Sequence, residues 1–228
     1  MTEREKILGR VREALAVKAP KPYSGLGGRP EPTVGPNGAT ARQWLPAVGE
    51  GFEARLALFS ENAARLKADF LLLENEQDLN RRLLELRDAE GWKKVGIHGG
   101  ELVQAACQSL NLPVCRTDEG YRVDDLEDCD AGITECDALV AQTGSVVVTS
   151  RSAGGRALSV LPAHHVVLAR RSQLLADLPE AFALLKNKYG ASYPSFISFI
   201  TGPSRTGDIE RILVLGAHGP KKLTIFCV

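Results

Sequence analysis

The apolar residues in the first half of the chain follow two alternating patterns. Over residues 52–66 they recur every three or four positions, which predicts an amphipathic helix. Asn75 can cap a second helix, whose apolar positions continue to residue 89 and which Gly91 can end. Short unbroken apolar runs, typical of buried strands, stand beside these helices at residues 70–73 and 94–97, and a third helical stretch covers 102–110. This alternation predicts an α/β fold with parallel strands.

The second half of the chain has a different pattern of apolar residues. Valine-rich runs on both sides of Thr143-Gly144-Ser145 predict a hairpin with a tight turn. Further apolar runs predict strands at residues 166–168, 196–200, 212–215 and 223–226, a helix over 174–185 and a short helix starting around Thr206. Because hairpins and crossovers are combined here, we expect a mixed sheet and not a purely parallel one.

The N-terminal region is predicted to be separate from the globular part. Apolar residues at helical spacing predict one amphipathic helix within residues 1–17. Residues 18–49 hold six of the twelve prolines and six glycines, a composition that cannot bury enough apolar surface to fold alone. We therefore divide the chain into a helix (1–17), a Pro/Gly-rich arm (18–49) and an α/β domain (51–228).

Charge and composition exclude several classes of function. The formal net charge is zero, so no overall field draws the protein to nucleic acid or to an anionic membrane. Residues 138–228, however, carry ten Lys or Arg against four Asp or Glu, which suits a small anionic ligand or is simply a set of solvated faces. The five cysteines have no CxxC spacing, so neither an iron–sulfur cluster nor a zinc site is predicted. Without a membrane span or an apolar leader, we expect a cytoplasmic protein.

The most informative segment is the stretch from Thr201 to Glu210. Gly202 and Pro203 force a turn between a predicted strand and a predicted helix, where open α/β sheets often bind ligands. Ser204 or Thr206 could cap that helix, with Asp208 in its first turn. Free backbone N–H groups and the fork of Arg205 would then face an anion. The alternative is an ordinary capped turn.

Three other segments could contribute to the same site. His218 stands between glycines, could act as an acid, a base or an anion donor, and is followed by Gly219. Gly144 allows close backbone approach between the hydroxyls of Thr143 and Ser145. His164 and His165 should point to opposite faces of a strand, so at most one looks inward. His98 could point into the same cleft as His218. For each of them, a plain structural role is the alternative.

Taken in order, four of these segments resemble a known pattern. The segments are Thr143-Gly144-Ser145 before a valine strand, Leu161-Pro162-x-x-His165, Gly202-Pro203-Ser204-Arg205-Thr206-x-Asp208-Ile209-Glu210, and Gly216-x-His218-Gly219-Pro220. The pattern is similar to that of the LUD domain of the lactate-utilisation protein C family. The resemblance is convincing over residues 138–228, and its last two segments are the specific ones.

The resemblance implies a three-layer α/β/α fold with a mixed sheet, of the kind seen in ribose-phosphate isomerases, glucosamine-phosphate deaminases and CoA transferases. It implies a non-redox subunit that works with two iron–sulfur partners, of A and B type, which oxidise L-lactate to pyruvate. No cofactor motif is evident in this chain, so iron–sulfur clusters are expected on the partners only. His218 and Asp208 are the best candidates for catalysis, and the other residues named above for binding a small anion.

Two alternative functions remain open at this stage. One is a stand-alone enzyme acting on a sugar phosphate or an acyl-CoA, although a likeness of fold is weak support for an activity. A CoA transferase would need a glutamate nucleophile at a strand end, and residues 138–228 offer none beside a glycine-rich turn. The other is a purely structural subunit that binds its partners through residues 1–49.

Overall fold

The computed structural model describes residues 3–16, 47–190, 192–206, 214–216 and 218–228. The chain divides into two compact units, Met1–Trp44 and Leu45–Val228. In the first unit, α1 (Glu3–Ala16) has the predicted helical form, and the side chains of Ile7 and Leu8 are 60% and 41% exposed. None of the helices in the described residues has the length and apolarity needed to cross a membrane.

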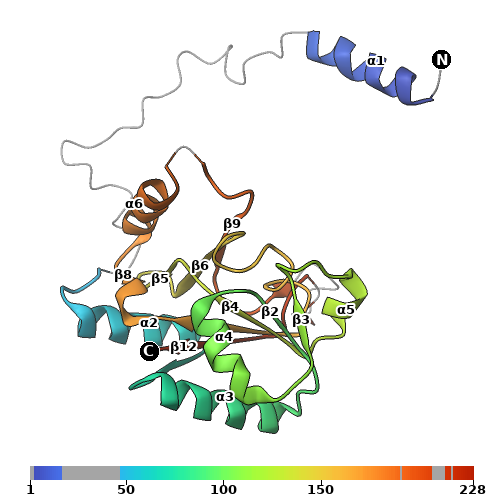
Figure 1. Ribbon diagram of the computed structural model, residues 1–228. Helices are drawn as coiled ribbons and strands as arrows, with labels where there is room; N and C mark the ends of the chain where they lie inside the picture. Colours follow the sequence, from blue (N-terminus) through green and yellow to red (C-terminus); the bar gives the residue numbers. More distant parts are fainter. Residues whose placement is uncertain (1–2, 17–46, 191, 207–213, 217) are drawn as a thin grey trace, which may run out of the picture. The chain divides into compact units, whose positions relative to one another are not determined.

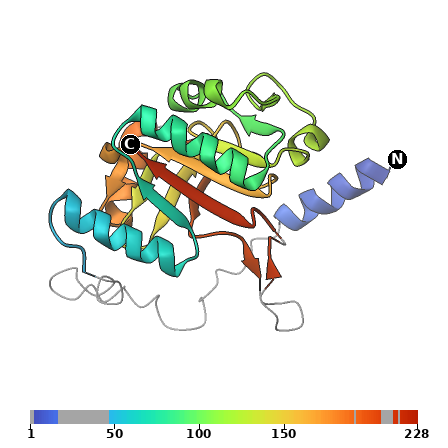
Figure 2. The ribbon, with the colours of Figure 1, turned by 90° about the horizontal axis from the view of Figure 1, so that it is seen from below.

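The second unit contains a six-stranded sheet in which every pair of neighbours is parallel. Its strand order is β1-β12-β7-β4-β2-β3. In Figure 2, β12 is the long red arrow that runs through the sheet. The strands are β1 (Asp69–Leu72), β2 (Val95–Ile97), β3 (Val114–Arg116), β4 (Ala131–Glu135), β7 (His164–Ala169) and β12 (Lys222–Cys227).

A second, four-stranded sheet holds the mixed pairing that the sequence predicts. Its order is β8-β5-β6-β9, with a parallel β5–β8 pair and two antiparallel pairs. The predicted hairpin around Gly144 is confirmed as the connection from β5 to β6. The strands are β5 (Ala138–Val140), β6 (Ser145–Thr149), β8 (Leu174–Leu175) and β9 (Ile197–Ile200). A separate antiparallel pair joins β10 (Arg205–Thr206) to β11 (Val214–Leu215).

Helices and the second sheet cover the two faces of the parallel sheet. On one face, a hydrophobic cluster joins β2, β4 and β7 to α3 (Glu76–Glu90) and α4 (Glu101–Cys107), which leads into η2 (Gln108–Leu110). On the other face, a second cluster joins β7 and β12 to α2 (Phe52–Arg65) and the four-stranded sheet. Outside that sheet packs α6 (Leu178–Tyr189). Figure 1 shows this layering, which confirms the predicted three-layer α/β/α fold.

Several helix ends follow the sequence signals closely. The Asn75 side chain accepts a hydrogen bond from the Asp78 amide, and α3 ends at Gly91 in the left-handed conformation, as predicted. The start of the predicted helix over 174–185 is wrong, because Leu174 and Leu175 pair with β5. The helix begins later, where Asp177 accepts a hydrogen bond from the Glu180 amide. The sequence analysis also missed β3, α5 (Val123–Glu127), β4 and η3 (Arg171–Gln173).

The short helix predicted to start around Thr206 would occupy residues that lie outside the described part of the chain. Arg205 and Thr206 form β10, and their register partners are Leu215 and Val214 on β11. This pairing with a segment eight to ten residues later was not predicted from the local sequence. Asp208, which was expected in the first helical turn, lies outside the described residues.

Candidate functional site

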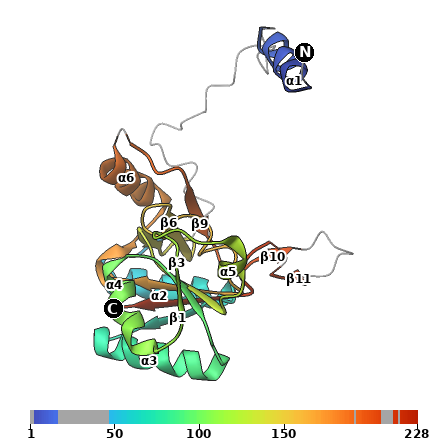
Figure 3. The same ribbon diagram turned by 45° about the vertical axis from the view of Figure 1, so that its right-hand side comes forward.

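Two of the motif segments lie side by side at the base of the β10–β11 pair. The Ser204 amide donates a hydrogen bond to the Pro220 carbonyl at 2.9 Å, and the Gly216 amide donates to the Ser204 carbonyl at 2.9 Å. Figure 3 shows β10 and β11 beside one another at the end of this unit. The Ser204 amide is thus already paired and is not one of the free N–H groups that the sequence analysis expected to face an anion.

Residues of both segments line a cavity of about 170 Å³, which we call the amino-edge pocket. At ~30 Å³ of liquid volume per water, this space equals roughly six water molecules. It is smaller than the ~300–1,000 Å³ typical of sites for drug-sized ligands. The pocket is lined by Ser159, Val160, His165, Ile200, Thr201, Gly202, Pro203, Ser204, His218, Gly219, Pro220 and Leu223.

The pocket lies at the amino ends of β7 and β12, which gives it its name. His165 is the second residue of β7, while Pro220 and Leu223 flank the start of β12. The Lys221 amide donates to the Ala163 carbonyl at 2.8 Å, which fixes the two strand starts together. The motif follows the strand after which it was predicted, β9, but it lies at the amino edge of the parallel sheet. Because β9 belongs to the second sheet, the segment after it reaches the amino edge of the parallel sheet.

Buried glycines bring the motif turns against helix α2. Gly202 has a φ of +87°, and a Cβ placed on it would lie 2.9 Å from the Leu66 carbonyl oxygen. Gly144 has a φ of +65°, and its Cβ would lie 2.8 Å from the Asn62 Cβ. Asn62 in turn donates to the Ala141 carbonyl at 2.8 Å. Both turns thus need glycine for close packing on α2, whether or not a ligand is present.

The Thr143–Ser145 turn reaches the pocket indirectly. The Ser145 hydroxyl donates to Thr143 Oγ1 at 2.8 Å and lies 2.8 Å from Thr201 Oγ1. Thr201 lines the pocket, while Thr143, Gly144 and Ser145 do not. A short chain of hydroxyls therefore connects the hairpin turn to the pocket wall, so that the turn supports the pocket without forming it.

His165 is the most deeply buried polar residue of the pocket, with 1% of its surface exposed. Its Nε2 lies 2.9 Å from Thr134 Oγ1, and its Nδ1 finds no hydrogen-bond partner among the described residues. Burial, with a smaller contribution from the neighbouring His164, lowers the pKa of His165 from 6.5 to about 3. The ring is therefore neutral at physiological pH, and its Nδ1 is buried without a partner among the described residues.

His164 points to the opposite face of the sheet, as predicted. Its Nε2 lies 2.9 Å from Thr224 Oγ1, and its ring meets Trp92 edge to face at 5.5 Å. Burial lowers its pKa from 6.5 to about 4. His164 therefore belongs to the core beside α3 and not to the pocket.

The structure brings together six of the predicted site residues. These line the pocket: His165, Gly202, Pro203, Ser204, His218 and Gly219. Arg205 lies on exposed β10 just outside, and its Nη2 would be 3.4 Å from a Cβ on Gly202. Thr206 is also on β10 and does not line the pocket, and Asp208 lies outside the described residues. Thr201 and Pro220, at the ends of the motif segments, also line the pocket, whereas the lining residues Ser159, Val160, Ile200 and Leu223 were not predicted, although most of them adjoin a motif segment.

A second hollow, the carboxyl-edge cleft, lies at the other edge of the parallel sheet. It has a volume of about 500 Å³ and includes His98 after β2, Asp118 after β3, Glu135 at the end of β4, and Arg151. After β2 the chain enters α4 on one face, and after β4 it enters the second sheet on the other face. Such a divergence of connections is where α/β sheets commonly bind ligands. His98 therefore does not share a cleft with His218, contrary to the prediction.

The carboxyl-edge cleft is organised by its own side chains. Glu135 Oε1 accepts hydrogen bonds from the amides of Leu102 (2.9 Å) and Val103 (3.3 Å) in the first turn of α4. A carboxylate thus already occupies the position at the start of this helix where an anion would be favoured. His98 Nδ1 faces the Gly100 amide at 3.0 Å, and burial lowers the pKa of this ring.

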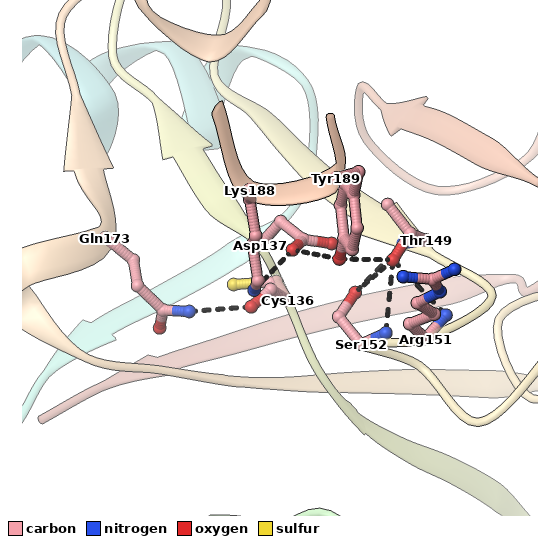
Figure 4. Close-up of polar contacts among 8 residues, drawn as sticks. All are labelled: Cys136, Asp137, Thr149, Arg151, Ser152, Gln173, Lys188 and Tyr189. Atoms are coloured by element: carbon pink, nitrogen blue, oxygen red, sulfur yellow. Dashed lines mark hydrogen bonds and ion pairs between the residues drawn. The ribbon is translucent and has the colours of Figure 1, made fainter. Parts of the chain in front are cut away.

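A buried acid stands behind this cleft. Asp137 Oδ1 accepts hydrogen bonds from Lys188 Nζ at 2.7 Å and from the Tyr189 hydroxyl at 2.6 Å (Figure 4). Burial alone would raise the pKa of Asp137, but the hydrogen bonds from Lys188, Ser152 and Tyr189 and the Lys188 charge bring it below 3.8. The network ties the last turn of α6 to the start of β5. Among the described residues, no three His, Cys, Asp or Glu side chains are grouped as a metal ion would require.

Comparison with known proteins identifies the family. The family model for the LUD domain matches residues 56–228. A protein named Lactate utilization protein C from Shouchella clausii is 30% identical over 205 residues, covering 86% of this chain and 89% of that protein. One of the same name from Halalkalibacterium halodurans is 40% identical over 105 residues, 45% of this chain and 46% of that protein.

The fold has a counterpart among solved structures. The crystal structure of a DUF162 family protein from Deinococcus radiodurans matches with a TM-score of 0.64 and 20% identity, covering 79% of this chain and 99% of that one. At this identity the match concerns the fold alone. Together with the domain match and the full-length similarity to the Shouchella protein, it leads to one conclusion: the chain belongs to the lactate-utilisation protein C family of LUD-domain proteins.

Proposed function

We propose that this protein is a non-redox accessory subunit of L-lactate utilisation whose amino-edge pocket binds a small carboxylate. The role in lactate utilisation is inferred from the relatives named Lactate utilization protein C. The class of ligand is inferred from the pocket itself. Its volume of about 170 Å³ suits a ligand of a few heavy atoms, and hydroxyl, imidazole and apolar groups all reach it. A nucleotide or a whole acyl-CoA would not fit within this space.

The surroundings of the pocket favour a carboxylate at its mouth. Thr201, Ser204 and the exposed His218 supply hydrogen-bond donors there, and Arg205 stands beside the wall formed by Gly202. A planar guanidinium binds a carboxylate with two parallel hydrogen bonds. In this proposal Arg205 attracts the carboxylate, while the hydroxyls and His218 hold it.

The electron-carrying centres are assigned to partner proteins. Oxidation of L-lactate to pyruvate removes two electrons and two protons, so it needs a redox group. Burial raises the pKa of Cys107 and Cys129 to about 12 and that of Cys227 to about 11, and it raises the pKa of Cys136 well above 9.0. These thiols stay protonated, and the five cysteines lack the CxxC spacing of an iron–sulfur site. Iron–sulfur proteins of A and B type are therefore the proposed partners.

Growth on L-lactate as the only carbon source tests this proposal. Deletion of the gene should abolish growth, and the intact gene should restore it. Arg205→Ala and His218→Ala should fail to restore growth while accumulating as folded protein. Arg82→Ala, an exposed arginine on α3, is the matched control and should restore growth. Normal growth of the deletion strain would contradict the role in lactate utilisation.

An acyl-CoA enzyme is the second candidate, and one observation favours it. Glu135 lies at the end of β4, and a Cβ on Gly100 would touch its carboxylate, so a glutamate does stand beside a glycine pair at a strand end. Its two hydrogen bonds to α4 stabilise the carboxylate and reduce its nucleophilicity. Incubation with acetyl-CoA and L-lactate, followed by hydroxylamine trapping of a glutamyl thioester, should give a Glu135-dependent adduct if this candidate is correct.

A further inference from the structure

We infer that Cys115 and Cys129 are an oxidisable pair of thiols, and that the disulfide between them fixes the acidic segment of residues 118–128 against the parallel sheet. The disulfide is formed by a hydroperoxide and removed by a dithiol. The inference goes beyond the proposed function and does not depend on it, because it concerns residues outside the amino-edge pocket.

The first argument is the position of the two thiols. Cys115 is the register partner of Gly96 on the neighbouring strand β2, so the two residues face the same side of the sheet. A Cβ placed on Gly96 would lie 3.7 Å from Cys129 Sγ. Cys115 packs against the cluster formed by Leu126, Cys129 and Leu158, and a hydrogen bond joins the two thiols. The thiols are therefore in contact before any oxidation takes place.

The second argument is the difference in exposure within the pair. Cys115 is partly exposed on β3, at the edge of the parallel sheet, whereas Cys129 is buried. Burial raises the pKa of Cys129 to about 12, so its thiol stays protonated at neutral pH and does not react first. An oxidant therefore reacts with Cys115, and Cys129 completes the disulfide. An accessible cysteine beside a second, resolving cysteine is the usual arrangement of a redox-sensing pair.

A second pair of cysteines shows why this exposure matters. Cys136 and Cys227 belong to one hydrophobic cluster, and burial, with smaller contributions from neighbours that include Cys227, raises the pKa of Cys136 well above 9.0. Both are buried, as is Cys107 on α4. Among the five cysteines, all of which lie in the described part of the chain, Cys115 alone is partly exposed. Only the pair that contains Cys115 thus combines contact between thiols with access for an oxidant.

The third argument is the chain between the two thiols. Residues 118–128 carry six acids against one base, Arg122, and Leu126 is the only buried residue among them. Few buried contacts favour local opening of a segment, and repulsion between like charges adds to it. The segment includes α5, which lies beside β3 (Figures 1 and 3). A disulfide closes the segment into a loop between β3 and the start of β4 and thereby opposes its opening.

This segment also forms part of the carboxyl-edge cleft. Asp118 is its first residue and lines that cleft. The oxidation state of the two thiols therefore sets how firmly one part of the cleft wall is held.

The reaction balances with hydrogen peroxide as the two-electron oxidant. The Cys115 thiol loses its proton and attacks one peroxide oxygen, the O–O bond breaks, and the released hydroxide takes up that proton, leaving a sulfenic acid and water. The Cys129 sulfur then attacks the Cys115 sulfur, the S–O bond breaks, and the hydroxide leaves with the Cys129 proton as a second water. Two thiols and one peroxide thus give one disulfide and two waters. Dithiothreitol reverses the change by thiol–disulfide exchange.

The test treats the reduced full chain with hydrogen peroxide, blocks the remaining thiols with iodoacetamide under denaturing conditions, and locates the linkage by tandem mass spectrometry. Trypsin leaves Cys107 with Cys115 in residues 95–116 and Cys129 with Cys136 in residues 123–151, so fragmentation within each peptide assigns the sulfurs. Hydrogen exchange of the amides in residues 118–128 is followed in the reduced and the oxidised protein. Cys115→Ala is the test variant, and Cys107→Ala is the matched control.

We expect two of the five thiols to disappear as a Cys115–Cys129 disulfide and dithiothreitol to restore both. Cys115→Ala should abolish the linkage, and Cys107→Ala should retain it. Oxidation should slow amide exchange in residues 118–128 by about tenfold or more, and should not slow it in Cys115→Ala.

The linkage in the unsubstituted protein decides the assignment even if a variant does not fold. Five unreacted thiols, a sulfinic acid on Cys115 without a linkage, or a disulfide between other cysteines would overturn it. A Cys115–Cys129 disulfide that leaves amide exchange in residues 118–128 unchanged would overturn its effect on the acidic segment. The proposed role in lactate utilisation is unaffected by any of these results.

Discussion

The two edges of the parallel sheet carry hollows of different size and construction. The carboxyl-edge cleft has about 500 Å³ and lies where α/β sheets usually bind ligands, whereas the amino-edge pocket has only about 170 Å³. The motif residues nevertheless gather at the smaller one. At the carboxyl edge, Glu135 is engaged with α4, while at the amino edge a nitrogen of His165 has no partner in the described residues. The two edges therefore differ in how the polar groups beside them are hydrogen-bonded, as well as in the volume of their hollows.

Acid should destabilise the amino edge most, because two buried histidines lie there against one, His98, at the carboxyl edge, and this is the largest effect that we expect. In the unfolded chain His164 and His165 take up protons near pH 6.5, but in the folded protein only near pH 4 and pH 3. The stability that they provide is complete above pH 6.5 and falls as the pH decreases towards those values. At 1.36 kcal/mol per pH unit, the loss by pH 4 is about 3 kcal/mol for each ring.

Urea unfolding at several pH values measures this loss. The folding free energy should decline steeply between pH 6.5 and 4, and the double variant His164→Gln/His165→Gln should remove most of that slope. At the carboxyl edge, Asp137 has a lowered pKa, so its contribution is lost only as the pH falls below 3.8. If the pH dependence of the folding free energy were unchanged in the double variant, the two buried histidines would not be its cause.

Breaking the ion pair behind the carboxyl-edge cleft should have the next largest effect. Lys188→Ala removes the charged donor to the buried Asp137 carboxylate. Loss of a buried pair costs ~3–5 kcal/mol, but Lys188 is half exposed, so we expect roughly 2 kcal/mol. Lys186→Ala, two residues away and exposed, is the control and should change stability little. Equal effects of the two substitutions would contradict the structural role of the network.

The smallest effect concerns Glu135. Glu135→Gln keeps one acceptor for the α4 amides but removes the charge at the start of the helix, so it should cost about 1 kcal/mol. Because Glu135 belongs to the other edge, the affinity for L-lactate should stay the same. Thermal melting and calorimetry together measure the two quantities, and a large loss of affinity would indicate that the two edges act as one site.

The success of sequence reasoning depends on how far apart the interacting residues lie in the chain. Asn75 and Gly91 act within one turn of their helix, so their roles were predicted correctly. Asp177 followed by Pro179 and Glu180 is an equally local signal that marks the true start of α6. Arg205 and Thr206, by contrast, pair with residues 214–215, and no local pattern indicates this pairing.

The candidate site follows the same rule. The motif segments predicted which residues lie close together, and six of the predicted residues line one pocket. The edge at which they gather depends on strand order and direction, because β9 belongs to the second sheet and runs antiparallel to β6. The contact between His165 Nε2 and Thr134 likewise depends on how two neighbouring strands are aligned. Neither property can be derived from the spacing of residues in the sequence.

The two histidines at the start of β7 also bear on how this strand finds its alignment. The strand reads His-His-Val-Val-Leu-Ala, and all six side chains are buried. A shift by one residue would exchange histidine for histidine and valine for valine at two positions, so its own pattern discriminates poorly between alignments. The correct alignment must then come from its neighbours, which pair it through Ala131–Glu135 on one side and Lys222–Cys227 on the other. His165 therefore owes its place beside the pocket to both neighbouring strands and not to the pattern of its own strand.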